Sequence, residues 1–268
     1  MGLKMCAVLV TGGSQGVGKG IVEGLAEAGY VVFFTGRDSE RLEQTAEQAA
    51  ALGGEVFPRR VDHGDDSQVQ ELFAEIAKKH GLELLVNNVW GGYENMVEGG
   101  RFTWVDPYWE QPAWRWDAMM GIGVRGAFIA SQLATRLMLE QAGGLIVNIS
   151  FWAAQKHVGN VLYGMAKAAT DKLTADMAAE LADRDVDVVS LYPGLVRTEK
   201  VMAAAEHLDL SNSESPRFIG RTIAALLKNR DMRRRLTGHV CVAAQVARDL
   251  GVRDIDGSSP APLALDRI

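Results

Sequence analysis

Short apolar runs separated by amphipathic stretches recur along most of the chain. The runs lie at residues 5–10, 30–35, 56–62, 84–88, 145–150, 187–192 and 238–244. Because they are continuous rather than alternating, they are typical of strands buried on both faces of a parallel sheet. Stretches between them carry apolar residues every three or four positions, as at Val69, Leu72, Phe73 and Ile76, which predicts helices. The pattern therefore predicts an α/β fold: one doubly wound, mostly seven-stranded parallel sheet with helices on both faces.

Residues 93–116 interrupt this alternation. The segment contains Trp104, Trp109, Trp114 and Trp116, together with two tyrosines and two prolines. Long irregular segments in compact domains are usually functional or mobile. Two interpretations remain open. The segment forms a wall or lid of a pocket for an apolar or aromatic ligand, or its aromatic side chains pack it onto the body or fill a subunit interface.

Two other segments have a distinct composition. Residues 116–140 carry an apolar stripe that predicts a single long helix, and glycines at 121, 123 and 126 indicate a kink or a close backbone contact within it. Residues 198–214 are polar and rich in alanine, which predicts a mobile segment over a site. We find no repeat, low-complexity region or linker that would divide the chain.

Composition narrows the classes of function. The 268 residues carry 28 Lys and Arg against 34 Asp and Glu, a net charge of -6, which argues against a nucleic-acid or anionic-membrane surface. No apolar run approaches the ~20 residues that span a bilayer. The 5 histidines are scattered without metal-ligand spacing, so no metal site is expected. Cys6 and Cys241 lie in apolar segments, which indicates two buried free thiols in a cytoplasmic protein.

The first strand leads into a glycine-rich turn, Thr11-Gly-Gly-Ser-Gln-Gly-Val-Gly18, and then into an amphipathic helix. Glycines let a backbone approach a pyrophosphate, and a helix N-terminus offers free N–H groups and the positive end of its dipole. The spacing Gly12-x3-Gly16-x-Gly18 differs from the common G-x-G-x-x-G, but its place between strand and helix predicts a dinucleotide-binding loop. We interpret residues 1–268 as a single dinucleotide-binding and catalytic domain with a Rossmann fold.

The ends of the second and third strands indicate which dinucleotide binds. In dinucleotide folds an acidic residue at the end of the second strand accepts a hydrogen bond from the ribose 2′-OH of NAD. This chain has Gly36 there, followed by Arg37, whose guanidinium suits a 2′-phosphate. NADP(H) is therefore favoured over NAD(H), and the alternative is an ordinary surface arginine. Asp62, at the end of the third strand, can accept a hydrogen bond from the adenine amino group.

Tyr163 and Lys167 are the candidate catalytic pair. They are four residues apart in a predicted helix, so both side chains lie on one face, one turn apart. A phenol titrates near ~10, and a neighbouring ammonium favours its ionised form. Such a tyrosine can donate or accept a proton near neutral pH. Taken alone, the pair is also compatible with a packed tyrosine and a solvated lysine.

The ordered set of motifs resembles the short-chain dehydrogenase/reductase family. The set is Thr11-Gly-x3-Gly16-x-Gly18, Asp62, Asn87-Asn88, Ser150, Tyr163-x3-Lys167 and Pro193-Gly194, and it extends over about residues 5–245. Three stretches resemble more narrowly the subgroup that contains animal dehydrogenase/reductase SDR family member 1, for which reduction of steroid-like and xenobiotic carbonyls is implied. These stretches are Tyr108-Trp-Glu-Gln-Pro112, Gly121-Ile-Gly-Val-Arg-Gly126 and Ala247-Arg-Asp-Leu-Gly-Val-Arg-Asp-Ile-Asp-Gly257.

The resemblance implies a role for each matching residue. Ser150 is expected to bind the substrate carbonyl oxygen, Tyr163 to donate the proton in reduction or accept it in oxidation, and Lys167 to lower the pKa of Tyr163 and hold the nicotinamide ribose. The cofactor supplies the hydride. The implied cofactor contacts are Gly12, Ser14, Gly16, Val17 and Gly18 at the pyrophosphate, Asn88 near the ribose, and Pro193, Gly194, Val196 and Thr198 at the carboxamide end.

The chain departs from the family pattern at two positions. Gly123 aligns with the asparagine that supports a helix kink and a water in the family's proton relay. The family often has two consecutive serines, the second catalytic, where this chain has Ser150-Phe151, so the strand register places Phe151 at the catalytic position. The spacing instead selects Ser150, thirteen residues before Tyr163, and we adopt the spacing.

These observations predict an NADP(H)-dependent oxidoreductase that interconverts a lipophilic ketone or aldehyde and its alcohol. The alternative is a catalytically weak NADP(H)-binding sensor or scaffold protein, which the glycine at position 123 favours and the intact Ser150, Tyr163 and Lys167 oppose. The resemblance also implies a homodimer or homotetramer, with a small-molecule substrate and no nucleic-acid partner. The natural substrate and the physiological direction do not follow from the sequence.

Overall fold

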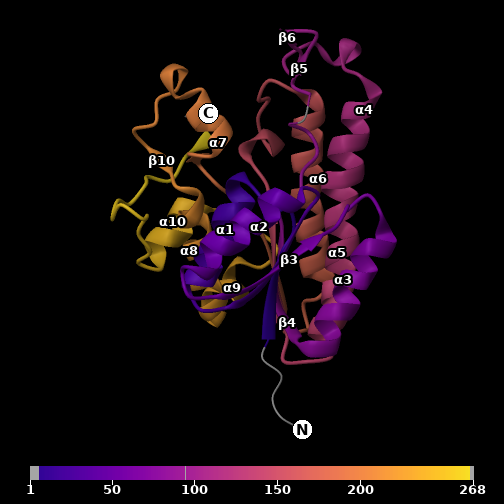
Figure 1. The fold of residues 1–268 in the computed structure, drawn as a ribbon, viewed down its shortest axis with the longest axis vertical. Helices are drawn as coiled ribbons and strands as arrows, with labels where there is room; N and C mark the ends of the chain where they lie inside the picture. The colour runs from indigo at the N-terminus through magenta and orange to yellow at the C-terminus, as the bar shows by residue number, and fades with distance from the viewer. Residues whose placement is uncertain (1–5, 94, 266–268) are drawn as a thin grey trace.

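Seven parallel strands form the central sheet of the computed structural model, which describes residues 6–93 and 95–265 (Figure 1). They are β1 (Cys6–Val10), β2 (Val31–Gly36), β3 (Glu55–Arg60), β4 (Gly81–Asn87), β7 (Gly144–Ile149), β8 (Val186–Tyr192) and β11 (Val240–Val242). Their order is β11-β8-β7-β4-β1-β2-β3, and each neighbouring pair is parallel. The predicted doubly wound fold is confirmed. Met5, predicted to begin the first strand, lies outside the described residues.

The apolar runs become interior strands because helices cover both of their faces. Residues 7–10 of β1 have no exposed surface, and all of β8 is buried. The edge strand β3 is less buried and carries Pro58. Proline has no N–H to donate, so it is tolerated at an edge, where no further strand needs that donor.

Two groups of helices cover the two faces of the sheet (Figure 1). One face packs against α1 (Gly16–Glu27), α2 (Ser39–Ala50), α8 (Pro216–Lys228), α9 (Arg230–Leu236) and α10 (Ala243–Asp249). The other packs against α3 (Asp66–Lys79), α5 (Gly126–Leu139) and α6 (Val161–Glu180). Each group shares an apolar cluster with the sheet, so the core consists of two layers separated by the strands.

Side-chain caps fix where several helices begin. Asp38 accepts hydrogen bonds from the backbone N–H groups of residues 40 and 41 at the start of α2. Asp65 accepts from the N–H of residue 67 in α3, and Ser215 accepts from that of residue 218 in α8. Such caps satisfy N–H groups that the helix itself leaves without a partner. The capping residues that the sequence indicates thus set the registers of these helices.

Helices α1 and α8 touch through glycine. A Cβ added to Gly20 would lie 2.1 Å from the carbonyl carbon of Pro216, and one added to Gly24 would lie 2.7 Å from the Cα of Gly220. Both distances are far below a normal contact, so only glycine permits this approach. Because α1 begins at the predicted dinucleotide loop, the contact with α8 also positions that loop.

The structure corrects two of the predicted elements and the predicted burial of one cysteine. The predicted helix over 116–140 starts earlier, with α4 (Ala113–Trp116), and continues through a π-helical turn, η2 (Asp117–Arg125), before α5. The strand predicted over 238–244 covers only Val240–Val242, because the two alanines after it begin α10. Cys6 and Cys241 are free thiols, but only Cys241 is buried.

Two segments lie at the end of the molecule where the parallel strands terminate (Figure 1). The aromatic segment contains the hairpin β5 (Val97–Glu98) and β6 (Arg101–Phe102), then η1 (Tyr108–Glu110) and α4. The segment predicted to be mobile, residues 198–214, contains α7 (Glu199–Ala203), η4 (Ala205–His207) and β10 (Ser213–Glu214), which pairs with β9 (Leu195–Val196) just before the segment. In residues 6–93 and 95–265, no helix is long and apolar enough to cross a membrane, and no acidic, histidine or cysteine side chains cluster as metal ligands.

Candidate active site

The predicted dinucleotide loop is a tight turn that only glycine can form. Gly12 and Gly16 have φ values of 68° and 57°, in the left-handed region. A Cβ on Gly18 would lie 2.0 Å from the carbonyl oxygen of Gly12. The backbone N–H of Gly12 donates to Thr35 Oγ1 at 3.1 Å, which anchors the loop to β2. The loop therefore reaches the N-terminus of α1 in the geometry that a pyrophosphate site requires.

Polar side chains from neighbouring strands hold this loop. Asn88 Nδ2 donates to the carbonyl oxygen of Gly12 at 2.8 Å, and the Asn88 backbone N–H donates to Thr11 Oγ1 at 3.0 Å. Asn88 was expected near the ribose, and its present contacts are with the loop itself. His63, which the sequence did not single out, lies 2.8 Å from Thr35 Oγ1 through its Nε2. Burial lowers the pKa of His63 to about 4, so the ring is neutral at physiological pH.

An anionic side chain occupies the loop at Gly16. The backbone N–H of Gly16 donates to Glu199 Oε2 at 3.0 Å, and Lys19 Nζ lies 4.0 Å from Glu199 Oε1. Glu199 is the first residue of α7, directly after Thr198, whose side chain caps that helix. The carboxylate stands where a phosphate oxygen of a dinucleotide would bind, so the loop fits the anion that the motif predicts.

The end of β2 lacks an acidic side chain for a structural reason. A Cβ on Gly36 would lie 2.7 Å from Ser14 Oγ, so a larger residue there would collide with the dinucleotide loop. Arg37 is exposed, and its carbonyl oxygen accepts a hydrogen bond from Arg60 Nε at 3.1 Å. Asp62 accepts a hydrogen bond from a neighbouring backbone N–H at 2.9 Å and lies beyond the end of β3. The Arg60 guanidinium and the exposed residue Arg37 thus lie together beside the end of β2.

A buried carboxyl group supports the Pro193-Gly194 turn. Glu214 Oε2 accepts the backbone N–H of Gly194 at 2.8 Å, and Val196 pairs with Glu214 between β9 and β10. Burial raises the pKa of Glu214 to about 7, with the Gly194 hydrogen bond opposing the shift. This group was not found from the sequence, where it reads as one more charged residue in a polar segment.

We expect Glu214→Gln to remove part of the pH dependence of stability. A carboxyl whose folded pKa of about 7 exceeds its ordinary 4.5 contributes stability that is fully present below about 4.5 and is lost as the pH rises to about 7. The measurement is the free energy of unfolding in urea at pH 4.5 and at pH 8. Between these two values the wild type should lose more stability than the variant, and the difference between the two losses should be at most about 3 kcal/mol. The exposed Glu180→Gln is the matched control. An identical fall in Glu214→Gln would contradict the assignment.

Tyr163 lies at the start of α6, with its backbone N–H capped by Asn160 Oδ1 at 3.1 Å. Asn160 Nδ2 also donates to the carbonyl oxygen of Trp104 at 2.8 Å. The capping residue therefore links the Tyr163 helix to the aromatic segment. Sequence reasoning missed Asn160, although asparagine before an apolar helix is a recognised start signal.

Aromatic rings surround the Tyr163 side chain, which is 6% exposed. Its ring centroid lies 5.6 Å from that of Trp90, 5.4 Å from that of Trp104 and 6.2 Å from that of Phe151. The Tyr93 hydroxyl donates to the Tyr163 hydroxyl at 3.2 Å. Two of these rings, Tyr93 and Trp104, come from the aromatic segment, so this segment both packs onto the body and forms a wall beside Tyr163.

Lys167 is buried one turn after Tyr163. Its Nζ donates to the carbonyl oxygen of Ile149 at 3.1 Å and lies 4.4 Å from the centroid of the Trp90 ring. Burial lowers the pKa of Lys167 to about 8. Burial also raises the pKa of Tyr163 well above 10.0. The net direction at Tyr163 is opposite to the lowering expected from Lys167, because the aromatic wall removes water from the phenol.

Ser150 lies directly after β7, and other groups engage its hydroxyl. Ser150 Oγ donates to the backbone carbonyl oxygen of Lys167 at 3.3 Å, and its oxygen lies beside the Tyr192 hydroxyl. Tyr192 donates in turn to Asp171 Oδ2. Within the described part of the chain, no hydrogen bond joins Ser150 to Tyr163. The structure thus brings Tyr163 and Lys167 together, but the Ser150 hydroxyl donates to the backbone of α6 at Lys167 rather than to the Tyr163 hydroxyl.

Gly123 provides room for Trp90. A Cβ on Gly123 would lie 2.8 Å from Cε3 of the Trp90 indole, so the ring rests directly against the π-helical turn η2. The glycines predicted a kink or a close contact, and the structure has a π-helical turn with this close contact. Such turns often occur at functional sites. An indole ring therefore takes the space beside the position where the family's asparagine would project.

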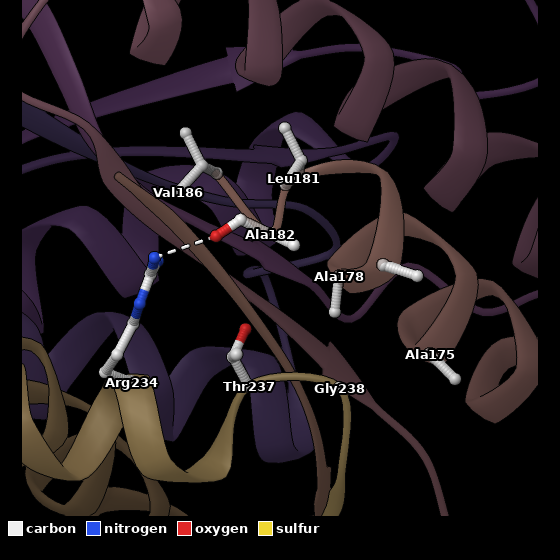
Figure 2. Close-up of a pocket in the computed structure, with 9 residues that line it drawn as sticks. Ala175, Ala178, Leu181, Ala182, Val186, Arg234, Thr237 and Gly238 are labelled. Carbon is white, nitrogen blue, oxygen red and sulfur yellow. Dashed lines mark hydrogen bonds between the residues drawn. The ribbon is translucent and has the colours of Figure 1, made fainter. Parts of the chain in front are cut away.

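A cavity elsewhere in the molecule is not part of this site. Figure 2 shows a cavity between the end of α6 and α9, where Arg234 donates to the carbonyl oxygen of Ala182 at 2.9 Å. Its volume is about 320 Å³, and alanines make up four of its nine lining residues. Its lining begins at Ala175, twelve residues after Tyr163 on α6. At 1.5 Å per residue, that separation is roughly 18 Å along the helix. The cavity contains none of the predicted site residues.

Comparisons with known proteins agree with this geometry. The sequence model of the family described as short chain dehydrogenase matches residues 6–209. Dehydrogenase/reductase SDR family member 1 of Mus musculus is 38% identical over 264 residues, 93% of this chain and 83% of the relative. This similarity confirms the narrower resemblance drawn from the sequence.

Solved structures show the same fold. A short-chain type dehydrogenase/reductase from Mycobacterium marinum matches with a TM-score of 0.76 and 26% identity, covering 90% of this chain and 94% of the other. A Beutenbergia cavernae protein assigned as an NAD(P) dependent gluconate 5-dehydrogenase, solved with NADP at low occupancy, matches with a TM-score of 0.75 and 25% identity over 90% of this chain and 96% of the other.

Proposed function

Because the chain belongs to the short-chain dehydrogenase/reductase family, we propose that it is an NADP(H)-dependent oxidoreductase that interconverts a lipophilic ketone or aldehyde and the corresponding alcohol. The observation that carries the proposal is the position of Tyr163 and Lys167, which are buried one helical turn apart, with Lys167 bonded to the carboxyl end of β7. The dinucleotide loop likewise follows the carboxyl end of its strand, β1. The substrate class and the cofactor preference rest on the arguments that follow.

Residues of this chain bind and orient the dinucleotide. The N–H groups of Gly16 and Val17 and the N-terminus of α1 would bind the pyrophosphate, with Gly12 and Ser14 beside them. The turn at Pro193-Gly194, with Val196 and Thr198, would contact the carboxamide end, and Lys167 would hold the ribose hydroxyls. When bound, the cofactor supplies or accepts the hydride.

Tyr163 holds and transfers the proton. Its raised pKa keeps the phenol protonated at neutral pH, so it can donate its O–H proton to a carbonyl oxygen in reduction. In oxidation the same oxygen accepts the proton of the alcohol. The surrounding aromatic rings exclude water, which strengthens each hydrogen bond at the reacting oxygen.

The walls around Tyr163 favour an apolar substrate. The rings of Trp90, Trp104 and Phe151 and the side chain of Met96 form one apolar cluster with Tyr163. Such a surface binds hydrocarbon or aromatic groups through burial and stacking rather than through hydrogen bonds. We therefore place lipophilic carbonyl compounds ahead of sugars or small hydroxy acids as substrates.

Positive charge at the end of β2 favours NADP(H) over NAD(H). Arg37 and Arg60 lie close together at that edge, and Gly36 excludes the acidic side chain that would accept the 2′-OH of NAD. A guanidinium binds a phosphate with charge-assisted hydrogen bonds. The Beutenbergia cavernae relative was solved with NADP, which is compatible with the same preference here.

A catalytically weak NADP(H)-binding sensor or scaffold is the second candidate. Two features favour it. The Ser150 hydroxyl donates to the carbonyl oxygen of Lys167 beside Tyr192, and the pKa of Tyr163 is strongly raised. Both features weaken the arrangement that the family uses for proton transfer. The dinucleotide loop serves this candidate as well as it serves the enzyme.

Turnover separates the two candidates. We expect the protein to oxidise NADPH, followed at 340 nm, with at least one member of a panel of aromatic and steroid-like ketones and aldehydes. Binding of NADPH, measured by quenching of tryptophan fluorescence, is expected in either case. Binding without turnover of any panel member would overturn the enzyme assignment and leave the sensor.

Glu199→Gln is expected to tighten NADPH binding by about 5-fold, a free energy of about 1 kcal/mol that suits an exposed charge. The Glu199 carboxylate holds the Gly16 N–H and therefore competes with the pyrophosphate for it. Fluorescence titration with NADPH measures the change. Glu206→Gln, an exposed carboxyl paired with His207 in the same segment, should leave the affinity unchanged. Equal or weaker binding in Glu199→Gln would contradict the competition.

We also propose a homodimer or homotetramer in the cytoplasm. Helices α5 and α6 carry exposed apolar side chains at Phe128, Leu139, Val161 and Met165. Apolar groups on neighbouring helices are suited to pack against a second copy. Light scattering coupled to size-exclusion chromatography measures the mass of the assembly directly, and a monomer at micromolar concentration would contradict this proposal.

A further inference from the structure

A reacting carbonyl oxygen beside Tyr163 needs a second hydrogen-bond donor. The expected donor, the Ser150 hydroxyl, is hydrogen-bonded to another group. The Ser150 hydroxyl is 2% exposed, and it donates to the carbonyl oxygen of Lys167 beside the Tyr192 hydroxyl. The next residue, Phe151, presents a ring to Tyr163 and has no hydrogen to donate. A donor aimed at developing negative charge is among the largest contributions an active site makes. The position beside Tyr163 is therefore the place to look for one.

Tyr93 places a hydroxyl at that position. Its oxygen lies 3.2 Å from the Tyr163 oxygen, and the two phenols approach from different elements, one after β4 and one on α6. A carbonyl oxygen that accepts from Tyr163 is within reach of a second phenol at this separation. Burial around the Tyr93 hydroxyl raises its pKa, although 41% of the residue is exposed. The group thus remains a protonated donor at neutral pH.

The surroundings of Tyr93 hold it in place. Its ring centroid lies 5.9 Å from that of Trp90 and 5.5 Å from that of Trp104. Lys200 Nζ donates to its carbonyl oxygen at 3.3 Å and lies 6.0 Å from the ring centroid. A donor fixed before the reaction costs little reorganisation when charge develops.

The rest of the aromatic segment is fixed by Arg115, which has no exposed surface. Its guanidinium donates to the carbonyl oxygen of Thr103 at 3.1 Å and to that of Asn95 at 3.3 Å, and its Nη2 donates to Thr103 Oγ1 at 2.9 Å. These bonds tie α4 to the residues that follow Tyr93. The hydroxyl of Tyr93 is thus carried by a braced segment rather than by a free loop.

We propose that Tyr93 is a second catalytic hydroxyl, which donates a hydrogen bond to the reacting oxygen in the role expected of Ser150. The inference rests on the proposed carbonyl chemistry. In reduction, hydride transfer forms the new C–H bond, the π electrons of C=O move to oxygen, and the O–H bond of Tyr163 breaks as its proton moves to that oxygen. The Tyr93 O–H bond stays intact and stabilises the oxygen while it is negative. The Tyr163 phenolate then regains a proton from water.

Removing one hydroxyl tests this role. Tyr93→Phe keeps the ring and is expected to lower kcat by about 10²-fold, the cost of losing a donor at a developing oxyanion. Ser150→Ala should change kcat by less than about 3-fold, because its hydroxyl contacts only Lys167 and Tyr192. Tyr108→Phe is the matched control, a tyrosine of the same segment that is 66% exposed.

Two readouts besides turnover keep the test decisive. The Kd for NADPH and the urea midpoint should be unchanged in Tyr93→Phe, which shows that the site is intact. A kcat for Tyr93→Phe within about 3-fold of wild type, or a larger loss in Ser150→Ala, would overturn the proposal. If the wild type itself reduces no carbonyl, the proposed function fails instead.

Discussion

Tyr163→Phe is expected to lower kcat for carbonyl reduction by about 10³-fold, within the range that a positioned proton donor contributes. The substitution removes one oxygen and leaves the ring between Trp90, Trp104 and Phe151, so the apolar cluster is retained. Among the described residues, Tyr93 is the one side chain hydrogen-bonded to the Tyr163 hydroxyl that can donate a proton at neutral pH. Steady-state oxidation of NADPH with the best carbonyl of the panel provides the measurement.

Retained cofactor binding is the control for this variant. The Kd for NADPH should stay within about 3-fold of wild type, because the phenol oxygen is not the main anchor of the dinucleotide. The free energy of unfolding should change by only about 1 kcal/mol, the net value of one hydrogen bond between neutral groups. A variant that keeps more than about a tenth of the wild-type kcat would show that Tyr163 is not the proton donor.

Arg37→Asp is expected to reverse the cofactor preference. The change removes a guanidinium from the 2′-phosphate position and adds a carboxylate that can accept the 2′-OH of NAD. A hydrogen bond to a charged group contributes about 1.5–3 kcal/mol, so kcat/KM for NADPH should fall by about 10–100-fold while that for NADH rises. Arg60 stays beside the site and limits the loss.

The control for Arg37→Asp must carry the same change of charge. Arg248→Asp on α10 alters the net charge equally at another exposed position, and it should leave both cofactor constants unchanged. Ionic strength should be held fixed, because exposed phosphate contacts weaken as salt is added. Preference for NADH in the wild type, with no effect of Arg37→Asp, would contradict the choice of NADP(H).

The sheet and the position of Tyr163 could be predicted because their signals are local. A continuous apolar run records that both faces of a strand are covered, and the run predicted at 187–192 matches β8 to within one residue. The four-residue spacing of Tyr163 and Lys167 fixes their common helical face without any tertiary information. Where an element depended on alanine, as at residues 243 and 244, the pattern could not separate strand from helix.

The remaining features of the site depend on contacts between distant parts of the chain. The bond from Gly16 to Glu199 joins residues 183 positions apart, and no periodicity records it. The spacing placed Ser150 opposite Tyr163, but which way its hydroxyl points depends on Tyr192 and on the backbone of α6. The hydroxyl of Tyr93 was hidden in a segment whose aromatic residues could serve packing or function. In the structure they serve both.

The glycine contact between α1 and α8 makes the position of the cofactor loop depend on the packing of these two helices. A methyl group at Gly20 would meet the backbone of Pro216 at 2.1 Å, so any side chain there must push the two helices apart. The loop at Gly12–Gly18 would move with α1. Its N–H groups would then no longer point at the pyrophosphate, although no loop residue had changed. The residues of α1 that contact α8 are therefore restrained by the geometry of the cofactor loop as well as by helix packing. A relative with a larger residue at this position should carry a compensating change in α8.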